Sequence, residues 1–192
     1  MDYEIDKSSQ SDVLNLLLEP DENIYLQPNS IISKTYNLKE KISNKKTLWE
    51  KLATEKEKYT LTEVYTENES GVLTISPPHP GSIKALDVNE LRIESSSFLA
   101  VNSNANLELK TKEFFKSDDL NLIDIKNIDY IFCSGYHGII EIELDENQRT
   151  IINEKYLLAL DKSVEYNKLH SADSTHVLLG PGKVYLHTQK IR

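Results

Sequence analysis

Cysteine, methionine and tryptophan each occur only once among the 192 residues of this chain. Because a single cysteine cannot form an intrachain disulfide, the sequence excludes the disulfide-stapled scaffolds of small secreted proteins. That cysteine, Cys133, ends the apolar run Tyr130-Ile131-Phe132, which predicts a buried strand. No charged neighbour in the sequence favours a thiolate, so we expect a structural thiol and not a nucleophile.

Long hydrophobic runs are also absent, and the 22 lysines and arginines are outnumbered by 31 aspartates and glutamates. No apolar run approaches the roughly 18 residues that a membrane-spanning helix needs. The segment 1–6 is acidic and lacks the apolar core of a signal peptide and the arginine-rich face of a transit peptide, so we expect a cytoplasmic protein as the chain stands. A mitochondrial location would require a trimmed presequence. The net charge of −9 repels phosphate backbones, and we expect no nucleic-acid partner.

Catalytic and metal-binding motifs are absent from the sequence. None of the five histidines lies in a His-x-His pair, which a cupin metal site needs, and no Gly-x-Ser-x-Gly nucleophile elbow occurs. The glycine-rich segment 180–182 lies between predicted strands, whereas a phosphate-binding loop leads into a helix. We therefore assign no catalytic residue, no metal ligand and no cofactor.

One arrangement of residues is used three times. Each copy has an apolar strand, an acidic turn, a second strand, and an apolar pair before a small residue. The closing triplets are Ile31-Ile32-Ser33, Phe98-Leu99-Ala100 and Leu157-Leu158-Ala159, which follow the leading residues Leu18, Leu86 and Leu144 at nearly equal distances. An internal repeat of this kind predicts a mainly-β fold of antiparallel units.

Glycine and proline mark the ends of several predicted strands, where they supply turn conformations. The expected structural turns are at Pro80, Gly81, Gly135, Gly138, Gly180, Pro181 and Gly182. The last strand-glycine-strand segment has no hairpin partner after it, and the first repeat lacks a matching strand before it. We therefore predict a single domain over residues 1–192 in which the C-terminal strands complete the N-terminal repeat and leave no open edge.

Residues 37–58 differ from the rest of the chain. Apolar residues recur there near helical spacing, which predicts a small helical insertion near 37–58. They are Leu38, Ile42, Trp49 and Leu52. With Trp49, a set of lysines would form a basic surface for an anionic membrane or an acidic partner: Lys39, Lys41, Lys45 and Lys46. The alternative is a solvated helix that packs its apolar side on the β-sheets.

Short motifs in a characteristic order resemble the AIM24 family of tryptophan-RNA-binding-attenuator-like proteins. They are Tyr3-Glu4-Ile5, Pro80 to Ile83, Ser97 to Ala100, Gly135 to Gly138, Leu157 to Ala159, Gly180 to Val184, and Thr188-Gln189. The resemblance covers about residues 3–189. It implies a pseudo-repeated antiparallel β-sandwich or prism of attenuator-like, double-stranded β-helix-like units. Fungal members are mitochondrial and tied to inner-membrane organisation, whereas many bacterial and archaeal members have no known activity.

Two functions from different classes fit these observations. The first is a non-enzymatic scaffold or protein-interaction module, with a protein partner, self-association or peripheral contact with a membrane. The alternative is a small-ligand-binding β-barrel or a cupin-like enzyme. An enzyme requires histidines or carboxylates that converge on a cavity, so the arrangement of these side chains distinguishes the two.

Overall fold

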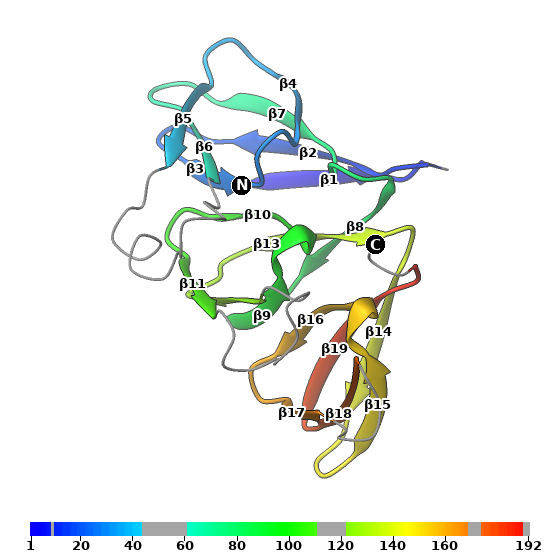
Figure 1. Cartoon of the computed structure of the whole chain (residues 1–192). Coiled ribbons are helices and arrows are strands. Elements are labelled where there is room, and N and C mark those ends of the chain that lie inside the picture. Colours follow the sequence, from blue (N-terminus) through cyan, green and yellow to red (C-terminus); the bar gives the residue numbers. More distant parts are fainter. Residues whose placement is uncertain (9, 44–60, 111–121, 169–173, 190–192) are drawn as a thin grey trace, which may run out of the picture.

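A computed structural model describes residues 1–8, 10–43, 61–110, 122–168 and 174–189 of the chain (Figure 1). These residues form β-strands and two short 3-10 turns, η1 (Ser95–Ser97) and η2 (Glu154–Tyr156). The strand pairings are antiparallel throughout the described residues. The mainly-β, antiparallel class predicted from the sequence is therefore confirmed.

Within the described ranges the strands form four sheets, which we call A to D. Sheet A has the order β1 (Asp2–Asp6), β2 (Val13–Leu18), β7 (Gly71–Ile75), β4 (Ile31–Lys34). Sheet B has the order β5 (Lys39–Ser43), β6 (Leu61–Tyr65), β3 (Asn23–Leu26), β10 (Phe98–Asn102), β13 (Ile131–Tyr136), β8 (Gly81–Leu86). Sheet C has the order β11 (Asn106–Lys110), β12 (Leu122–Lys126), β9 (Glu90–Glu94), β16 (Leu157–Asp161), β19 (Gly182–His187), β14 (Ile139–Leu144). Sheet D has the order β15 (Arg149–Asn153), β18 (Thr175–Leu179), β17 (Glu165–Lys168).

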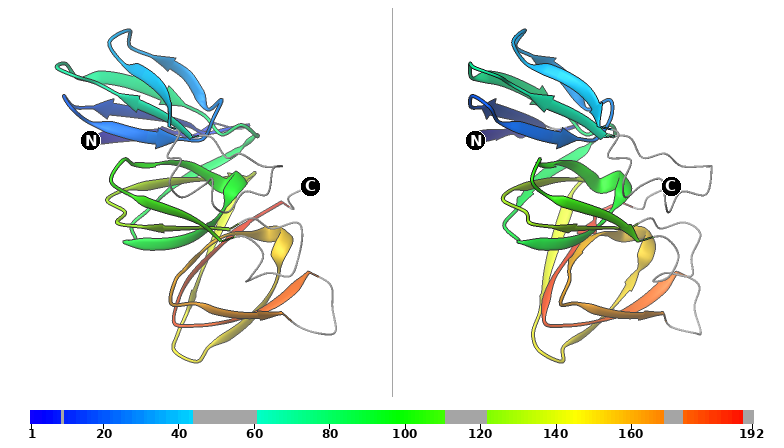
Figure 2. Two further views of the ribbon diagram at one scale, coloured as in Figure 1. Left: turned by 60° about the vertical axis from the view of Figure 1, so that its left-hand side comes forward. Right: turned by 90° about the vertical axis from the view of Figure 1, so that its left-hand side faces the viewer.

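The sheets are stacked in the order A, B, C, D, and a hydrophobic core lies between each neighbouring pair (Figure 1, Figure 2). The first core contains Leu16 and Leu73 of sheet A with Phe132 of sheet B, the second Phe98 of sheet B with Ile93 of sheet C, and the third Leu160 of sheet C with Leu178 of sheet D. The central strands of sheets B and C are thus buried on both faces, although Ile42 of β5 and Ile140 of β14 at their edges are exposed, whereas sheets A and D each bury one face.

The burial along a strand follows from its place in this stack. In β2, which covers the first core with one face only, burial alternates: Leu14, Leu16 and Leu18 are buried and the residues between them are not. In β10, which lies in an inner sheet, all five residues of Phe98–Asn102 are buried. A period of two therefore indicates an outer sheet and a continuous apolar run an inner one.

Each of the three sequence triplets lies at a register shift between two strands. The shifts fall between Ile31 and Ser33, Phe98 and Ala100, and Leu157 and Ala159. In β10, Phe98 faces the second core, whereas Leu99 and Ala100 both face the first. This is the geometry of a β-bulge, in which one additional residue interrupts the alternation of side chains. The superposition of the three units stays a prediction.

The C-terminal strands pair within the third unit and not with the first, which corrects the predicted closure. β18 pairs with β15 and β17, and β19 pairs with β14 and β16. Both edges of β2 are already occupied, by β1 and β7, so β2 has no free edge for a C-terminal strand. Pairing with strands that are nearer in sequence also costs less loop-closure entropy. That residues 1–192 form a single domain stays a prediction.

The start of the predicted helical insertion near 37–58 is a strand. Leu38 is buried in the first core, and the next residues, Lys39–Ser43, form β5 at the edge of sheet B. β5 pairs with β6 along its whole length, and these ladder hydrogen bonds outweigh the weak helical spacing of the apolar residues. Residues 44–58 lie outside the described part of the chain.

Candidate functional site

A buried carboxylate lies at each of the three junctions between sheets. Asp12, Glu94 and Glu154 are 3%, 6% and 2% exposed. A buried carboxylate is costly unless it is hydrogen-bonded or paired with a charge, so each of them indicates a site where the fold provides compensating groups. We call these three residues the interlayer carboxylates.

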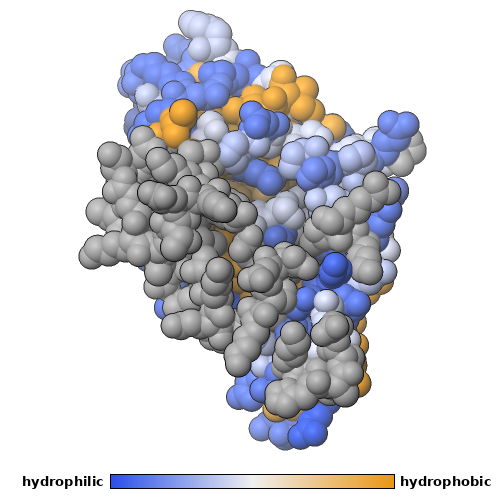
Figure 3. All heavy atoms as spheres, in the orientation of Figure 1, coloured by the Kyte–Doolittle hydropathy of each residue, from blue (hydrophilic) through white to orange (hydrophobic). Residues whose placement is uncertain are grey.

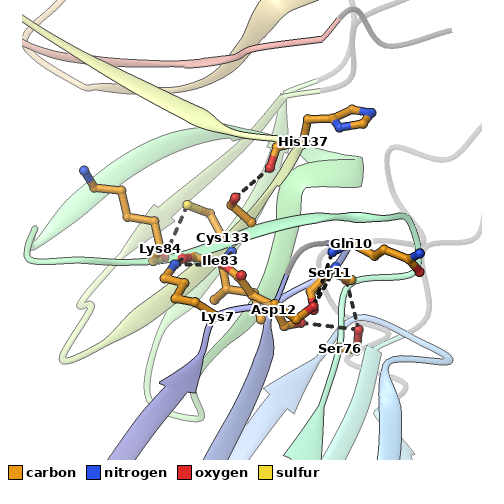
Figure 4. Close-up of polar contacts among 11 residues, drawn as sticks. Lys7, Gln10, Ser11, Asp12, Ser76, Ile83, Lys84, Cys133 and His137 are labelled. Carbon is orange, nitrogen blue, oxygen red and sulfur yellow. Dashed lines mark hydrogen bonds and ion pairs between the residues drawn. The ribbon is translucent and has the colours of Figure 1, made fainter.

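Asp12 links sheet A to sheet B. Its Oδ2 accepts hydrogen bonds from the backbone N–H of Ile83 (2.8 Å) and from Lys7 Nζ (2.7 Å), and its own N–H donates to Gly81 O (2.9 Å). Figure 4 shows these groups side by side, with Asp12 and Lys7 from the loop between β1 and β2 and Ile83 from β8. Two backbone hydrogen bonds and one cation hold the loop on the edge strand of sheet B, which is a structural role.

Glu94 lies at the junction of sheets B and C, at the N-cap of η1. Its carboxylate accepts hydrogen bonds from Ser96 N (2.8 Å), Ser95 Oγ (3.1 Å) and Ser97 Oγ (3.3 Å), and also from Ser96 Oγ. Burial raises the pKa of Glu94, and the hydrogen bonds from the serines counteract part of that effect. Glu94 therefore caps this short turn, and the three serines of the turn compensate its buried charge.

His187 of β19 reaches the same cluster from sheet C. Its Nδ1 accepts a hydrogen bond from the backbone N–H of Tyr136 (3.0 Å), and its Nε2 lies 3.1 Å from Ser97 Oγ. Burial lowers the pKa of His187 to about 4, so the ring is neutral near pH 7. Because Nδ1 is an acceptor, the single ring proton is on Nε2 and is donated to Ser97. The Tyr136 ring packs edge-on against His187 at 5.3 Å and stacks on His79 at 5.0 Å.

The cluster of Ser97, His187 and Glu94 contains the residue types of a catalytic triad in a different order. In a triad the histidine accepts the serine proton and the carboxylate orients the histidine. Here Glu94 accepts from Ser97, and the only lone pair of His187 in the ring plane is held by a backbone N–H. Ser97 is also fully buried. The arrangement therefore does not activate the serine; it links sheets B and C through polar groups.

A third junction repeats this use of a carboxylate and a histidine. Glu154, in η2 before β16 of sheet C, lies with its Oε2 2.7 Å from Nε2 of His176, in β18 of sheet D. The side chains are 3% and 1% exposed. Both groups are removed from water and lie within hydrogen-bond distance of each other, which suits a structural contact between layers.

A cavity of about 310 Å³ lies beside sheet C and β17. Its lining residues are Arg92, Lys162, Val164, Glu165, Tyr166 and Asn167. Buried Asp124 lies between two cations of this region: Arg92 Nε is 3.0 Å from Oδ1, and Lys162 Nζ is 3.2 Å from Oδ2. Asp124 offsets one of these two positive charges, and Glu90 Oε2, 3.9 Å from Lys162 Nζ, lies beside the other.

The lysines of the predicted basic surface are paired with carboxylates where the structure describes them. Lys39 Nζ lies 2.6 Å from Glu67 and Lys41 Nζ 3.0 Å from Glu63, and these hydrogen bonds raise the pKa of both lysines. Lys39 and Lys41 therefore do not form a positive patch by themselves. The other residues of that prediction, Lys45, Lys46 and Trp49, lie outside the described residues.

Three of the seven predicted turn residues lie in strands, which corrects their assignment. Gly81 begins β8, Gly135 lies in β13, and Gly182 begins β19; the four in connections are Pro80, Gly138, Gly180 and Pro181. A Cβ on Gly81 would lie 2.0 Å from Gly135 O, so glycine is required there for the close approach of two backbones. Gly182 has φ +136°, which other residues rarely adopt.

Sequence reasoning missed the interlayer carboxylates, and also His187 near Glu94 and His176 beside Glu154. Ser97 and His187 are 90 residues apart in the chain, and neither lies in a catalytic motif. Local sequence gave no signal for this cluster: Glu94 is the N-cap of η1, but glutamate is not among the residues that favour that position. In the described ranges, no three His, Cys, Asp or Glu residues are grouped so that they could hold a metal ion. No helix among the described residues has the length and apolar character to cross a membrane.

Cys133 is buried in β13, as predicted, and should not react with thiol reagents in the native protein. Its Sγ donates a hydrogen bond to Lys84 O (3.4 Å), and burial raises the pKa of the thiol to about 12. Because the thiolate is the reactive form, we expect less than a few per cent modification by Ellman's reagent under native conditions and complete modification in denaturant. Rapid native modification would show that the second core opens at Cys133.

Three comparisons with known proteins found relatives, and one of them concerns the fold. The sequence model of a family described as "Mitochondrial biogenesis AIM24" matches residues 3–189. An uncharacterized protein of Streptococcus pyogenes is 24% identical over an alignment of 204 residues. The alignment covers 98% of this chain and 81% of that protein. The crystal structure of a Streptococcus pyogenes protein has a TM-score of 0.81 at 19% identity, over 98% of this chain and 94% of that chain. This structural likeness concerns the fold, and neither relative's name states an activity.

Proposed function

The chain belongs to the AIM24 family, and we propose that it acts as a non-enzymatic protein-interaction module, a scaffold and not a catalyst. The observation that carries the proposal is the outer face of sheet A. The other faces that carry a bulge triplet are covered by a neighbouring sheet, whereas Ile32 on this face is 57% exposed. Exposed apolar side chains that form a contiguous patch are typical of protein–protein contacts.

The directions of the hydrogen bonds around Ser97 and His187 support the proposal that the protein is not an enzyme. The most enzyme-like cluster in the described residues, Ser97 with His187, is oriented so that the histidine donates to the serine. The interlayer carboxylates Asp12 and Glu154 are likewise engaged with groups inside the protein. Contact with a membrane surface is not part of the proposal, because Lys39 and Lys41 are each paired with a glutamate.

The ¹⁵N chemical shifts of the His187 ring nitrogens test the proposal that the protein is not an enzyme. We expect the neutral tautomer with the proton on Nε2, from about pH 5 to pH 8, because the pKa of His187 is about 4 and Nδ1 accepts from Tyr136 N–H. A fluorophosphonate probe for activated serines should label the wild type no more than Ser97→Ala. A proton on Nδ1 together with labelling of Ser97 would overturn the proposal.

A further inference from the structure

We propose that the cavity beside β17 binds a small organic acid with one carboxylate, and that Lys162 holds this carboxylate. The inference goes beyond the proposed function, because it concerns the sheet D end of the stack and not the outer face of sheet A. The cavity of about 310 Å³ falls within the range of about 300 to 1,000 Å³ that is typical of small-molecule sites. Such sites combine apolar walls with a few polar groups that orient the ligand.

The cavity lies between the face of sheet C and β17, the edge strand of sheet D in the described part of the chain. Arg92 of β9 lies opposite Leu160 of β16 and opposite Asp124 of β12, and residues that lie opposite each other share a face of the sheet. Because Leu160 belongs to the third core, this is the face toward sheet D. Sheet C therefore forms one wall of the cavity at Arg92, and residues 162–167 form the other.

Lys162 shares its closest carboxylate with another cation. Asp124, whose side chain is 3% exposed, accepts a hydrogen bond from Arg92 Nε and also lies 3.2 Å from Lys162 Nζ. Arg92 packs over the Tyr166 ring as well, so we assign the ligand to Lys162 and not to Arg92. The next acid, Glu90, is 3.9 Å from Lys162 and its side chain is 53% exposed, and exposed ion pairs contribute little. A carboxylate in the cavity therefore gives Lys162 an ion pair that the protein supplies only in part.

The rest of the wall has an apolar side and a polar rim. Val164 is 1% exposed in the third core, and half-buried Tyr166 packs against that core. Glu165 and Asn167 alternate with these residues along the chain and are exposed. The apolar body of a ligand fits against Val164 and Tyr166 while its carboxylate meets Lys162. The negative charge of Glu165 disfavours a second carboxylate on the ligand, so the site selects monocarboxylates.

The surface near this end of the molecule suits a small polar ligand better than an apolar partner. In the view of Figure 3, the described residues at the sheet D end are mainly hydrophilic, whereas hydrophobic residues gather over β4 and β7. Extended apolar patches are typical of contacts with proteins or membranes. We therefore assign a small molecule, and not a macromolecule, to the cavity beside β17.

A titration of the ¹⁵N-labelled protein with benzoate tests the inference. Benzoate is the probe because it joins one carboxylate to an apolar ring. For so small a ligand, we expect saturable shifts of the amide signals of residues 162–167, with a dissociation constant of about 1 mM. Neutral benzamide has nearly the same shape and should bind at least about tenfold more weakly. Phthalate, which has a second carboxylate, should also bind more weakly than benzoate.

Three variants separate the role of Lys162 from an effect on folding. Lys162→Gln should weaken the binding of benzoate at least about tenfold, whereas Lys162→Arg keeps the charge and should stay within about threefold of the wild type. The matched control is Lys39→Gln, which removes another lysine that is paired with a carboxylate but lies in β5 of sheet B. Its binding of benzoate should be unchanged. Melting temperatures without benzoate verify that each variant folds.

Four results would overturn the inference. They are the absence of saturable shifts at residues 162–167 up to about 20 mM benzoate, equal binding of benzoate and benzamide, tighter binding of phthalate than of benzoate, and undiminished binding by Lys162→Gln. The comparison of the three probes needs only the wild type, so it decides even where a variant does not fold. None of these results concerns the outer face of sheet A or the His187 tautomer, so the ligand site can fail while the proposed function stands.

Discussion

Replacing Gly81 with alanine should lower the free energy of unfolding by about 4 kcal/mol, at the upper end of what overpacking costs. The new Cβ would lie 2.0 Å from Gly135 O, and a backbone oxygen cannot move away as a side chain does. Because Gly81 O also accepts the N–H of Asp12, any shift of β8 disturbs the contact between sheets A and B. For a chain of this length, we expect the melting temperature to fall by about 10 °C in a thermal scan.

Gly138→Ala is the matched control for this experiment. Its Cβ would lie 3.1 Å from side-chain atoms of Thr188, which can rotate or shift by a few tenths of an ångström. We expect a change within about 1 kcal/mol. If Gly81→Ala were as mild as Gly138→Ala, the close approach of β8 and β13 at this point would not exist in solution.

Lowering the pH from 6.5 to 4 should destabilise the wild type through His187 by about 3 kcal/mol. The pKa of His187 is about 4 in the folded protein, whereas that of an unperturbed histidine is 6.5. The unfolded state therefore binds the proton first, and the stability that is present above pH 6.5 is lost as the pH falls toward 4. Urea unfolding at a series of pH values measures this slope.

The variant His187→Gln isolates this contribution, because glutamine keeps a donor for Ser97 and does not titrate. Its stability should fall less than that of the wild type between pH 6.5 and 4. Glu94 acts in the opposite direction in both proteins: its folded pKa is raised, so acid protonation relieves the cost of its buried charge. For each protein, the slope is the change in the free energy of unfolding with pH. The quantity to compare is the difference between the slopes of the wild type and His187→Gln. Equal slopes would show that His187 is not buried as a neutral ring.

The parts of the fold that depend on local patterns were predictable. The apolar run that ends at Cys133 predicted a buried strand, and that is confirmed. The three triplets pointed to a recurrent local feature, and each lies at a register shift. The start of the predicted helical insertion was wrong because ladder hydrogen bonds with β6 decide the conformation of residues 39–43. The apolar spacing that suggested a helix is compatible with a short edge strand as well.

The candidate site was much less predictable, since its contacts join distant parts of the chain. Glu94 caps η1 in the structure, but glutamate is not a preferred N-cap residue, and nothing near it in sequence indicates His187. Glu154 and His176 are likewise brought together only by the packing of sheet D on sheet C. A buried charge leaves no periodic pattern, so its partners become visible only when the layers are assembled.

The order of side chains along the chain determined most of the strands and the three triplets at which a register shift lies, whereas pairing with β6 decided residues 39–43. Both depend on hydrophobic alternation between neighbouring residues, which is a local property. The tertiary structure decided which sheet covers which face: Leu99 and Leu158 are buried and Ile32 is exposed, although all three occupy the same place in the repeated triplet. Position within the stack makes this difference, because a face loses its contact with water only when another sheet packs on it.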